Sequence, residues 1–169
     1  MTESNLVEVY VSAGSNIEPE KNLRVACGEL EELFGPLSQS SVYRTKAIGF
    51  DGDDFLNMVL SFSTRMSLDD IMAELERIQI LSGRKPSAPP FSPRTLDLDL
   101  LLYGQQVVDS SKISLPRADI TKYAFVLGPM AELAPRLRHP RSGKTMRELW
   151  AAFDRRKQPI QRLSDFPLA

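Results

Sequence analysis

The chain has 169 residues, of which 42% are hydrophobic and 25% are charged, and its formal net charge is −1. That length fits one domain whose core is large enough to fold without disulfides or metals, and the near-neutral charge argues against a broad nucleic-acid binder. A single cysteine (Cys27) and a single histidine (His139) exclude an intrachain disulfide and a zinc site built on several of these residues.

Alternating valines predict a strand over residues 6–13, which we expect to end at Gly14. A proline that suits the first turn of a helix, Pro19, opens a helix that continues to a glycine-proline stop. Two strands follow, over residues 40–46 and 55–63. In the second of these strands, alternate apolar residues predict one buried face.

Ser67 resembles the first residue of a capping box and opens a second helix. The proline-rich residues 83–93 predict a long loop. A regular strand over residues 95–103 comes next, and we expect one set of side chains to face the core: Leu96, Leu98, Leu100 and Leu102. The β-α-β-β-α-β order predicts an α+β fold, a ferredoxin-like antiparallel sheet with helices packed on it.

The remaining residues predict shorter elements: an extended stretch over 112–116, an apolar helix over 123–133 and a final strand over 160–163. Thr145 is expected to cap another helix. We expect residues 1–169 to form one compact domain, with residues 141–169 as its C-terminal extension.

Chain-wide features predict the setting of the protein. No apolar stretch approaches 18 residues, and the N-terminus lacks the basic and apolar segments of a signal peptide. We therefore expect a cytoplasmic monomer that has no membrane or nucleic-acid partner.

The strongest chemical signal is the segment Arg94-Thr-Leu-Asp97-Leu-Asp99. Strand alternation puts both carboxylates on one face, roughly 6.5–7 Å apart. Two such carboxylates can hold two divalent ions that bridge a polyphosphate. Taken alone, the segment favours the ordinary interpretation, a half-buried strand with a solvated acidic face.

Other polar side chains near this segment suggest a ligand. Arg84 and Arg94 flank the proline-rich loop, where guanidinium groups can neutralise phosphate charge and the loop can act as a lid. Phe55 and Asn57 share a strand face and can stack on and hydrogen-bond a flat heterocycle. Taken alone, each is better explained as a solvated arginine or an incidental surface residue.

Several short segments, considered together, match one family in order. They are Ala13-Gly-Ser-Asn16 with Asn22-Leu23, Ser41-Val-Tyr-Arg-Thr45, Asp54-Phe-Leu-Asn57, Gly83-Arg84, Pro93-Arg-Thr-Leu-Asp-Leu-Asp99, Leu115-Pro116 and Phe125-Val-Leu. In this the chain resembles the 6-hydroxymethyl-7,8-dihydropterin pyrophosphokinases of folate biosynthesis. The resemblance covers most of the chain, and the segment that ends in Asp99 is its most specific part.

The resemblance implies transfer of pyrophosphate from ATP to the pterin hydroxymethyl group, with release of AMP. It implies that Asp97 and Asp99 hold two Mg²⁺ ions and that Arg84 and Arg94 neutralise charge on the phosphates. Alignment and charge neutralisation are most of what such a transfer needs from a protein.

The resemblance also assigns two sets of binding residues. The residues expected at the pterin are Thr45, Ile48, Phe55, Asn57 and Phe125, the two phenylalanines sandwiching the ring. The residues expected at ATP are Glu76, Gln79, Arg84, Arg94, Leu100, Lys112, Ser114, Arg117 and Tyr123.

Three positions depart from the family. Arg117 stands where histidine is usual, Tyr123 where arginine is common, and Gln79 where glutamate is usual; the loop over residues 49–54 is also one residue short. Arginine binds phosphate well, so Arg117 can replace the lost basic residue.

Two alternative functions are considered. One is a non-catalytic pterin- or nucleotide-binding module that regulates or scaffolds a folate enzyme. The other is an RNA-binding domain, which needs aromatic residues on its central strands and a basic face, and this chain lacks both.

Overall fold

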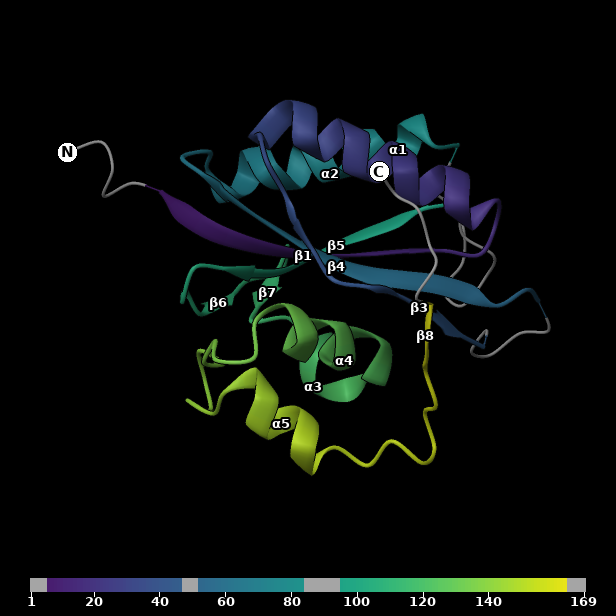
Figure 1. The fold of residues 1–169 in the computed structure, drawn as a ribbon. Coiled ribbons are helices and arrows are strands. Elements are labelled where there is room, and N and C mark those ends of the chain that lie inside the picture. Colours follow the sequence, from purple (N-terminus) through teal and green to yellow (C-terminus); the bar gives the residue numbers. More distant parts are fainter. Residues whose placement is uncertain (1–5, 47–51, 84–94, 164–169) are drawn as a thin grey trace.

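The protein is described here by a computed structural model that covers residues 6–46, 52–83 and 95–163 (Figure 1). Its first part consists of β1 (Val7–Ser15), α1 (Pro19–Phe34), β2 (Ser38–Gln39), β3 (Val42–Thr45), β4 (Phe55–Thr64), α2 (Leu68–Leu81) and β5 (Asp97–Tyr103). Its second part consists of β6 (Val108–Asp109), β7 (Ser114–Leu115), α3 (Asp119–Lys122), α4 (Ala124–Leu133), α5 (Met146–Ala152) and β8 (Gln161–Leu163). None of the helices in these ranges is long and apolar enough to span a membrane.

The main sheet has the strand order β5-β1-β4-β3-β8, with β2 paired to β4. The pairings are antiparallel, and the two helical connections leave β1 and β4 in the centre with β5 and β3 outside them. This is the arrangement of a β-α-β-β-α-β unit, so the predicted ferredoxin-like α+β fold is confirmed. β6 and β7 form a separate two-stranded sheet.

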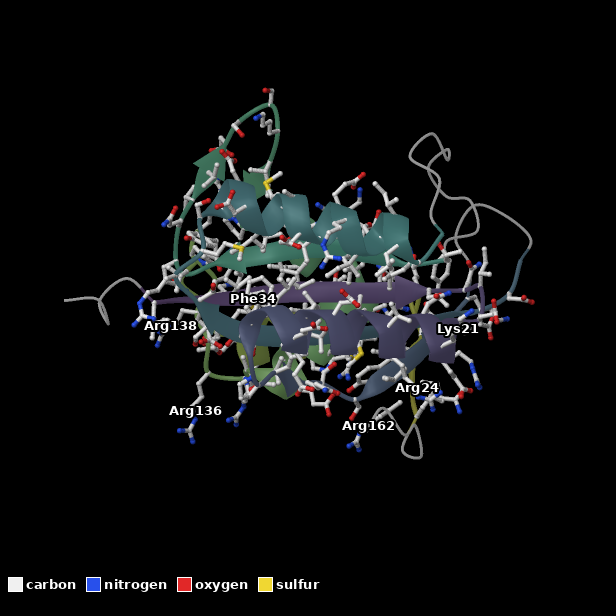
Figure 2. The ribbon with its side chains drawn as sticks, turned by 90° about the horizontal axis from the view of Figure 1, so that it is seen from above. Lys21, Arg24, Phe34, Arg136, Arg138 and Arg162 are labelled. Carbon is white, nitrogen blue, oxygen red and sulfur yellow. The ribbon has the colours of Figure 1, made fainter. Side chains whose placement is uncertain are left out.

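Helices cover both faces of the sheet. α1 and α2 lie side by side on one face, as the view from above shows (Figure 2), and Arg77 of α2 reaches Glu29 of α1 at 3.3 Å. α3, α4 and α5 lie on the other face (Figure 1). Alternate residues of β4 therefore enter different cores: Met58 packs under α1 and α2, whereas Val59 packs against the second helical layer.

A β-bulge in β5 changes the side on which its last leucines lie. Tyr10 pairs with Leu102 but Val11 pairs with Leu100, so Leu101 is an extra residue in the ladder. As a result Leu102 packs with the second core rather than the first, and its predicted orientation is wrong. A bulge depends on the partner strand, so alternation within one strand does not reveal it.

The helix starts predicted at Ser67 and Thr145 are confirmed, and local hydrogen bonds explain both. The Ser67 side chain accepts a hydrogen bond from the backbone N–H of Asp70 at 3.2 Å, and Thr145 forms a full capping box with Glu148. β1 continues through Gly14 to Ser15, however, so the predicted strand end is wrong. Neighbours on both sides hold Gly14 in the sheet, because it pairs with β4 and with β5.

The C-terminal residues are attached through close contacts. A Cβ on Gly128 of α4 would lie 2.8 Å from Ile160 Cδ1 and 3.1 Å from the Trp150 ring, so the missing side chain lets these groups approach the helix. β8 pairs with β3, and Arg162 Nε donates to Ser41 Oγ at 2.8 Å.

One carboxylate ties α4 to β3. Glu132 accepts hydrogen bonds from the Ser41 backbone N–H at 3.1 Å, from Ser41 Oγ at 2.6 Å and from the Tyr43 hydroxyl at 2.8 Å. Burial and the hydrogen bond to Glu132 raise the pKa of Tyr43 far above its ordinary value. β3, which carries Thr45, is thus held by contacts with α4 and with β8.

Candidate active site

Three predicted site residues, Asn57, Asp97 and Asp99, lie on the sheet face opposite α1 and α2, because their strand neighbours Met58, Leu98 and Leu100 pack under those helices. In the register of the sheet, Gly14 of β1 pairs with Asn57 of β4 on one side and with Asp97 of β5 on the other. Neighbouring strands lie about 4.8 Å apart, so the Asn57 and Asp97 backbones are separated by about 10 Å across a residue that has no side chain. The polar group expected at a heterocycle and the acidic pair therefore lie on either side of Gly14.

The acidic pair has the orientation that the sequence predicts. Leu98 and Leu100 are buried in the core under α1 and α2, whereas Asp97 and Asp99 are only partly buried on the opposite face. The leucines anchor the strand, so the two carboxylates project from a rigid element.

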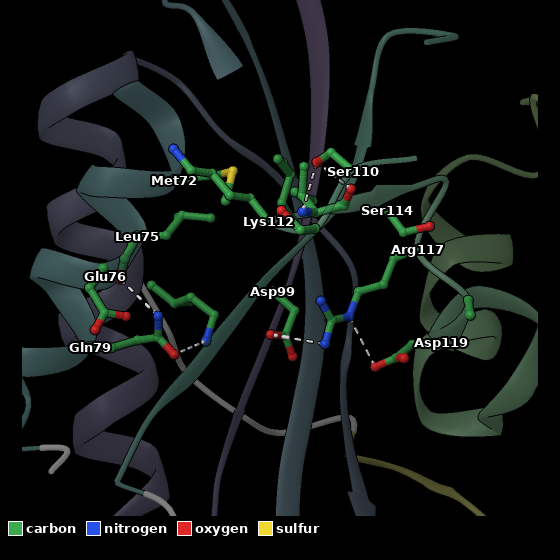
Figure 3. Close-up of a pocket in the computed structure, with 15 residues that line it drawn as sticks. Met72, Leu75, Glu76, Gln79, Asp99, Ser110, Lys112, Ser114, Arg117 and Asp119 are labelled. Atoms are coloured by element: carbon green, nitrogen blue, oxygen red, sulfur yellow. Dashed lines mark hydrogen bonds and ion pairs between the residues drawn. The ribbon is translucent and has the colours of Figure 1, made fainter. Parts of the chain in front are cut away.

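Arg117 stands beside this pair, between two carboxylates (Figure 3). Its Nη2 lies 3.5 Å from Asp99 Oδ1, and its Nε lies 3.1 Å from Asp119 Oδ2. Burial by itself lowers the pKa of the Arg117 guanidinium, but the charges of Asp99, Asp119 and Asp97 outweigh that effect, and the net pKa lies above its ordinary value.

A pocket of about 540 Å³ opens around the edge strand β5 (Figure 3). It is bounded by α2 on one side, by the β6–β7 hairpin and by the segment that leads into α3 on the other. The predicted ATP and metal residues that line it are Glu76, Gln79, Asp99, Leu100, Lys112, Ser114 and Arg117. The volume lies within the ordinary range for small-molecule sites.

Gln79 connects two walls of this pocket. Its Oε1 accepts a hydrogen bond from the Leu98 backbone N–H at 3.1 Å, and its Nε2 donates to the Leu75 carbonyl at 3.1 Å. β5 is the outer strand of the sheet, so Gln79 satisfies a backbone donor that no further strand reaches. This buried amide fastens α2 to the strand that carries the acidic pair.

Asn57 lies on the other side of Gly14 from the acidic pair. It is 6% exposed, and its Nδ2 donates to Thr45 Oγ1 at 2.9 Å. A Cβ on Gly14 would lie 2.7 Å from Asn57 Oδ1, closer than any real side chain approaches. Gly14 is therefore required for the Asn57 amide to lie where it does.

The two predicted aromatic residues near α4 lie together. The rings of Tyr123 and Phe125 stack with centroids 5.0 Å apart, and Lys122 Nζ lies 5.3 Å from the centre of the Tyr123 ring. Tyr123 is not among the residues that line the pocket beside β5. The structure thus places a residue predicted for ATP against one predicted for the pterin.

The sequence does not predict two contributors to the site. Its strand pattern predicts that Gly14 ends a strand, although a glycine inside a strand pattern is a signal of close backbone approach. For Asp119 the only signal is its position two residues after Arg117. Three predicted residues, Ile48, Arg84 and Arg94, lie outside the described residues.

The acidic pair suits a magnesium ion that arrives with a nucleotide. Mg²⁺ is usually held by one or two carboxylates together with substrate phosphates and water. Within residues 6–46, 52–83 and 95–163, the structure has no group of three or more histidine, cysteine, aspartate or glutamate side chains placed to hold a metal. Asp97 and Asp99 fit an ion whose remaining ligands come from a substrate.

Carboxylates on a rigid strand and cations around a pocket of this size suit one class of chemistry, the transfer of phosphoryl-type groups. The comparison with known sequences names the family. The chain belongs to the 7,8-dihydro-6-hydroxymethylpterin-pyrophosphokinase family of transferases, whose family model matches residues 10–135.

Relatives in bacteria support this membership over most of the chain. A 2-amino-4-hydroxy-6-hydroxymethyldihydropteridine pyrophosphokinase of Pseudomonas aeruginosa is 36% identical over 148 residues, which are 85% of this chain and 90% of the relative. A protein of the same name from Synechocystis is 35% identical over 85% of this chain and 75% of the relative.

Solved structures agree in fold. A crystal structure of HPPK-DHPS in complex with substrates has a TM-score of 0.71 at 10% sequence identity, covering 92% of this chain. Wild-type HPPK-DHPS of Plasmodium falciparum with pterin and p-hydroxybenzoate has a TM-score of 0.69 at 12% identity, covering 86%. This chain spans 46% and 43% of those chains, less than half of each.

Proposed function

We propose that this protein transfers the pyrophosphoryl group of ATP to 6-hydroxymethyl-7,8-dihydropterin, a reaction of folate biosynthesis. The hydroxymethyl oxygen forms a bond to the β-phosphorus of ATP, the bond from that phosphorus to the α–β bridging oxygen breaks, and AMP leaves. The hydroxyl proton is released. Family membership supports the reaction, and the observation that carries it is the pocket at which Asp99 and Arg117 meet.

The pocket beside β5 is the proposed ATP site. Its apolar wall includes Met72, Leu75 and Leu100, which suit a purine. Lys112 and Arg117 supply positive charge for the triphosphate. The substitution of histidine by Arg117 keeps a cation at this position, so we expect it to preserve nucleotide binding.

Asp97 and Asp99 are the proposed ligands of two Mg²⁺ ions. When bound, these ions neutralise phosphate charge and align the hydroxyl group with the β-phosphorus. The strand that carries the two carboxylates holds them in place through its buried leucines, and Gln79 fixes that strand to α2. By resemblance, Arg84 and Arg94 neutralise the charge that develops on the leaving phosphate.

The surface beside Asn57 is the proposed pterin site. The amide presents a neutral donor and acceptor to the ring edge, and the hydrogen bond to Thr45 fixes its orientation. Phe55 and Phe125 are the proposed stacking partners, and Ile48 is proposed to contribute a backbone group. Only β1 separates Asn57 on β4 from the acidic pair on β5, so a pterin bound at Asn57 would be close enough for direct transfer.

The deciding experiment measures AMP released from ATP and Mg²⁺, with and without 6-hydroxymethyl-7,8-dihydropterin. We expect AMP only when the pterin is present. Release of no AMP by folded protein would overturn the proposal. Binding of the pterin without turnover, measured by calorimetry, would then favour the alternative, a non-catalytic module. The monomeric state and the cytoplasmic location remain predictions of the sequence.

A further inference from the structure

Arg117 is held mainly by charge. Its guanidinium is shared between Asp99 and Asp119, at 3.5 Å and 3.1 Å, and both partners are acidic side chains at the pocket. Its Nε is buried yet makes no aligned hydrogen bond within the described part of the chain. The side chain remains 37% exposed to the pocket. A group held in this way can change partners without breaking a packed core.

This cation occupies the surroundings of the acidic pair before any nucleotide arrives. An ion that binds at Asp99 must compete with a guanidinium already 3.5 Å from one of its oxygens. Like charges a few ångström apart repel strongly in a partly desolvated pocket. The acidic pair therefore binds a free divalent ion weakly as long as Arg117 remains beside Asp99.

A nucleotide changes this balance. Its phosphates carry several negative charges and enter the same pocket, which Arg117 lines. A guanidinium binds phosphate in a bidentate way and favours it as a partner. Once Arg117 turns to a phosphate, Asp99 is released to the ion, and Asp119 keeps the arginine side chain within the pocket.

We propose that Arg117 is a built-in counter-cation that closes the acidic pair to free divalent ions and releases Asp99 when a nucleotide polyphosphate offers the guanidinium a better partner. This rests on the proposed function, because it takes Asp97 and Asp99 as the metal ligands. It adds a property that the family assignment does not contain: metal and nucleotide bind with strong positive coupling, set by one side chain.

The test measures Mn²⁺ binding by electron paramagnetic resonance, with and without α,β-methylene ATP and without pterin. In the wild type we expect weak binding of Mn²⁺ alone and much tighter binding with the nucleotide. In Arg117→Gln we expect about tenfold tighter binding of Mn²⁺ alone and a correspondingly smaller effect of the nucleotide. Arg117→Lys retains the charge and should restore part of the coupling.

Two further variants locate the effect. Arg77→Gln removes the same charge from α2, where Arg77 pairs with Glu74 at 2.7 Å, and should leave Mn²⁺ binding unchanged. Asp99→Asn should weaken Mn²⁺ binding in every background, which locates the ion at the acidic pair. Melting temperatures close to the wild type would show that each variant is folded.

The outcomes separate this inference from the proposed function. If Arg117→Gln binds Mn²⁺ alone no better than the wild type while nucleotide-dependent binding is intact, the counter-cation is refuted and the transfer reaction stands. If Mn²⁺ coupling behaves as expected but no AMP forms with pterin, the counter-cation stands and the proposed reaction falls. If the wild type binds no Mn²⁺ even with the nucleotide, both fall.

Discussion

The two sides of the site are built on different physical principles. On the proposed nucleotide side, Asp99 and Arg117 are about one-third exposed and form an ion pair. On the proposed pterin side, Asn57 is 6% exposed, forms a hydrogen bond to Thr45 and lies in the space that the missing Gly14 side chain leaves. Ion pairs therefore position the side chains on the first side, whereas close packing and a hydrogen bond position Asn57 on the second.

The difference predicts different responses to change. Partly exposed charged side chains can exchange partners, and salt, metal ions and phosphate all change the strength of their ion pairs. The buried Asn57 amide fits in one arrangement, between Thr45 and Gly14. A substitution at either neighbour should therefore displace the amide. Variants on the nucleotide side should alter ion dependence, and variants on the pterin side should alter affinity for one substrate.

The largest effect is expected on the charged side. Asp97→Ala removes a proposed metal ligand without touching a core residue, so pterin-dependent AMP release should fall by roughly a thousandfold, while the melting temperature stays near that of the wild type. A discontinuous AMP assay at ordinary Mg²⁺ measures it. Turnover retained under those conditions would refute the assignment of the metal ligands.

On the shape-determined side, Gly14→Ala should weaken pterin binding. The added Cβ would lie 2.7 Å from Asn57 Oδ1, and Gly14 is paired on both sides, so the Asn57 side chain must turn and lose its bond to Thr45. Loss of one well-placed hydrogen bond corresponds to about a tenfold lower affinity. Calorimetry with pterin and with ATP separately should show the loss for pterin only.

Asn57→Ala sharpens the same comparison. We expect it to weaken pterin binding by at least as much as Gly14→Ala and to leave ATP binding unchanged. Because both changes act through one amide, the double variant should be no worse than Asn57→Ala alone. If the losses of pterin affinity add up in the double variant, Gly14 acts on pterin binding by another route. If Asn57→Ala weakens ATP and pterin binding equally, other residues bind the edge of the pterin ring.

A smaller effect is expected outside both sides, at His139. Burial, and then the charge of Arg141, lower the pKa of this imidazole, and its Nδ1 accepts hydrogen bonds from the backbone N–H groups of Arg141 and Ser142 at 3.3 Å and 3.4 Å. The unfolded chain binds the proton more readily, so stability should fall as the pH drops below about 6.5, through the folded pKa.

Thermal melts of the wild type and of His139→Gln, measured from pH 7.5 to pH 5, test this expectation. The melting temperature of the wild type should fall more than that of the variant over that range. Equal slopes for the two proteins would show that other groups cause the pH dependence.

The smallest effect provides the matched control for Gly14. Gly28 lies inside α1, and a Cβ there would meet nothing within 4 Å. Gly28→Ala should therefore stabilise the protein by up to about 1 kcal/mol, because alanine favours a helix, with substrate binding unchanged. Denaturant unfolding measures the gain. A loss of pterin affinity here would show that the Gly14 result is not specific.

Local patterns predicted much of the site. Strand alternation put Asp97 and Asp99 on one face of their strand, and Phe55 and Asn57 on one face of theirs, because the direction of a side chain follows from its own backbone. The helix starts at Ser67 and Thr145 were likewise predicted, since a cap is a contact between residues three apart. These features need no knowledge of the rest of the molecule.

The two wrong predictions from the sequence, the strand end at Gly14 and the orientation of Leu102, have the same cause. The continuation of β1 through Gly14 and the bulge at Leu101 both depend on which residue of a neighbouring strand lies opposite. The second helical layer and the attachment of β8 depend on residues that are distant in the chain. Sequence periodicity describes one segment at a time and contains no such pairing information.

The amino-acid sequence by itself determined the antiparallel α+β fold, the common face of the acidic pair and the residue types of the proposed ATP and pterin sites. Only the tertiary structure decided that Gly14 makes room for Asn57 and that Arg117 rests between Asp99 and Asp119. The physical reason is distance. The first features arise from interactions within a few residues, whereas the second arise where strands and loops far apart in the chain come within a few ångström of one another.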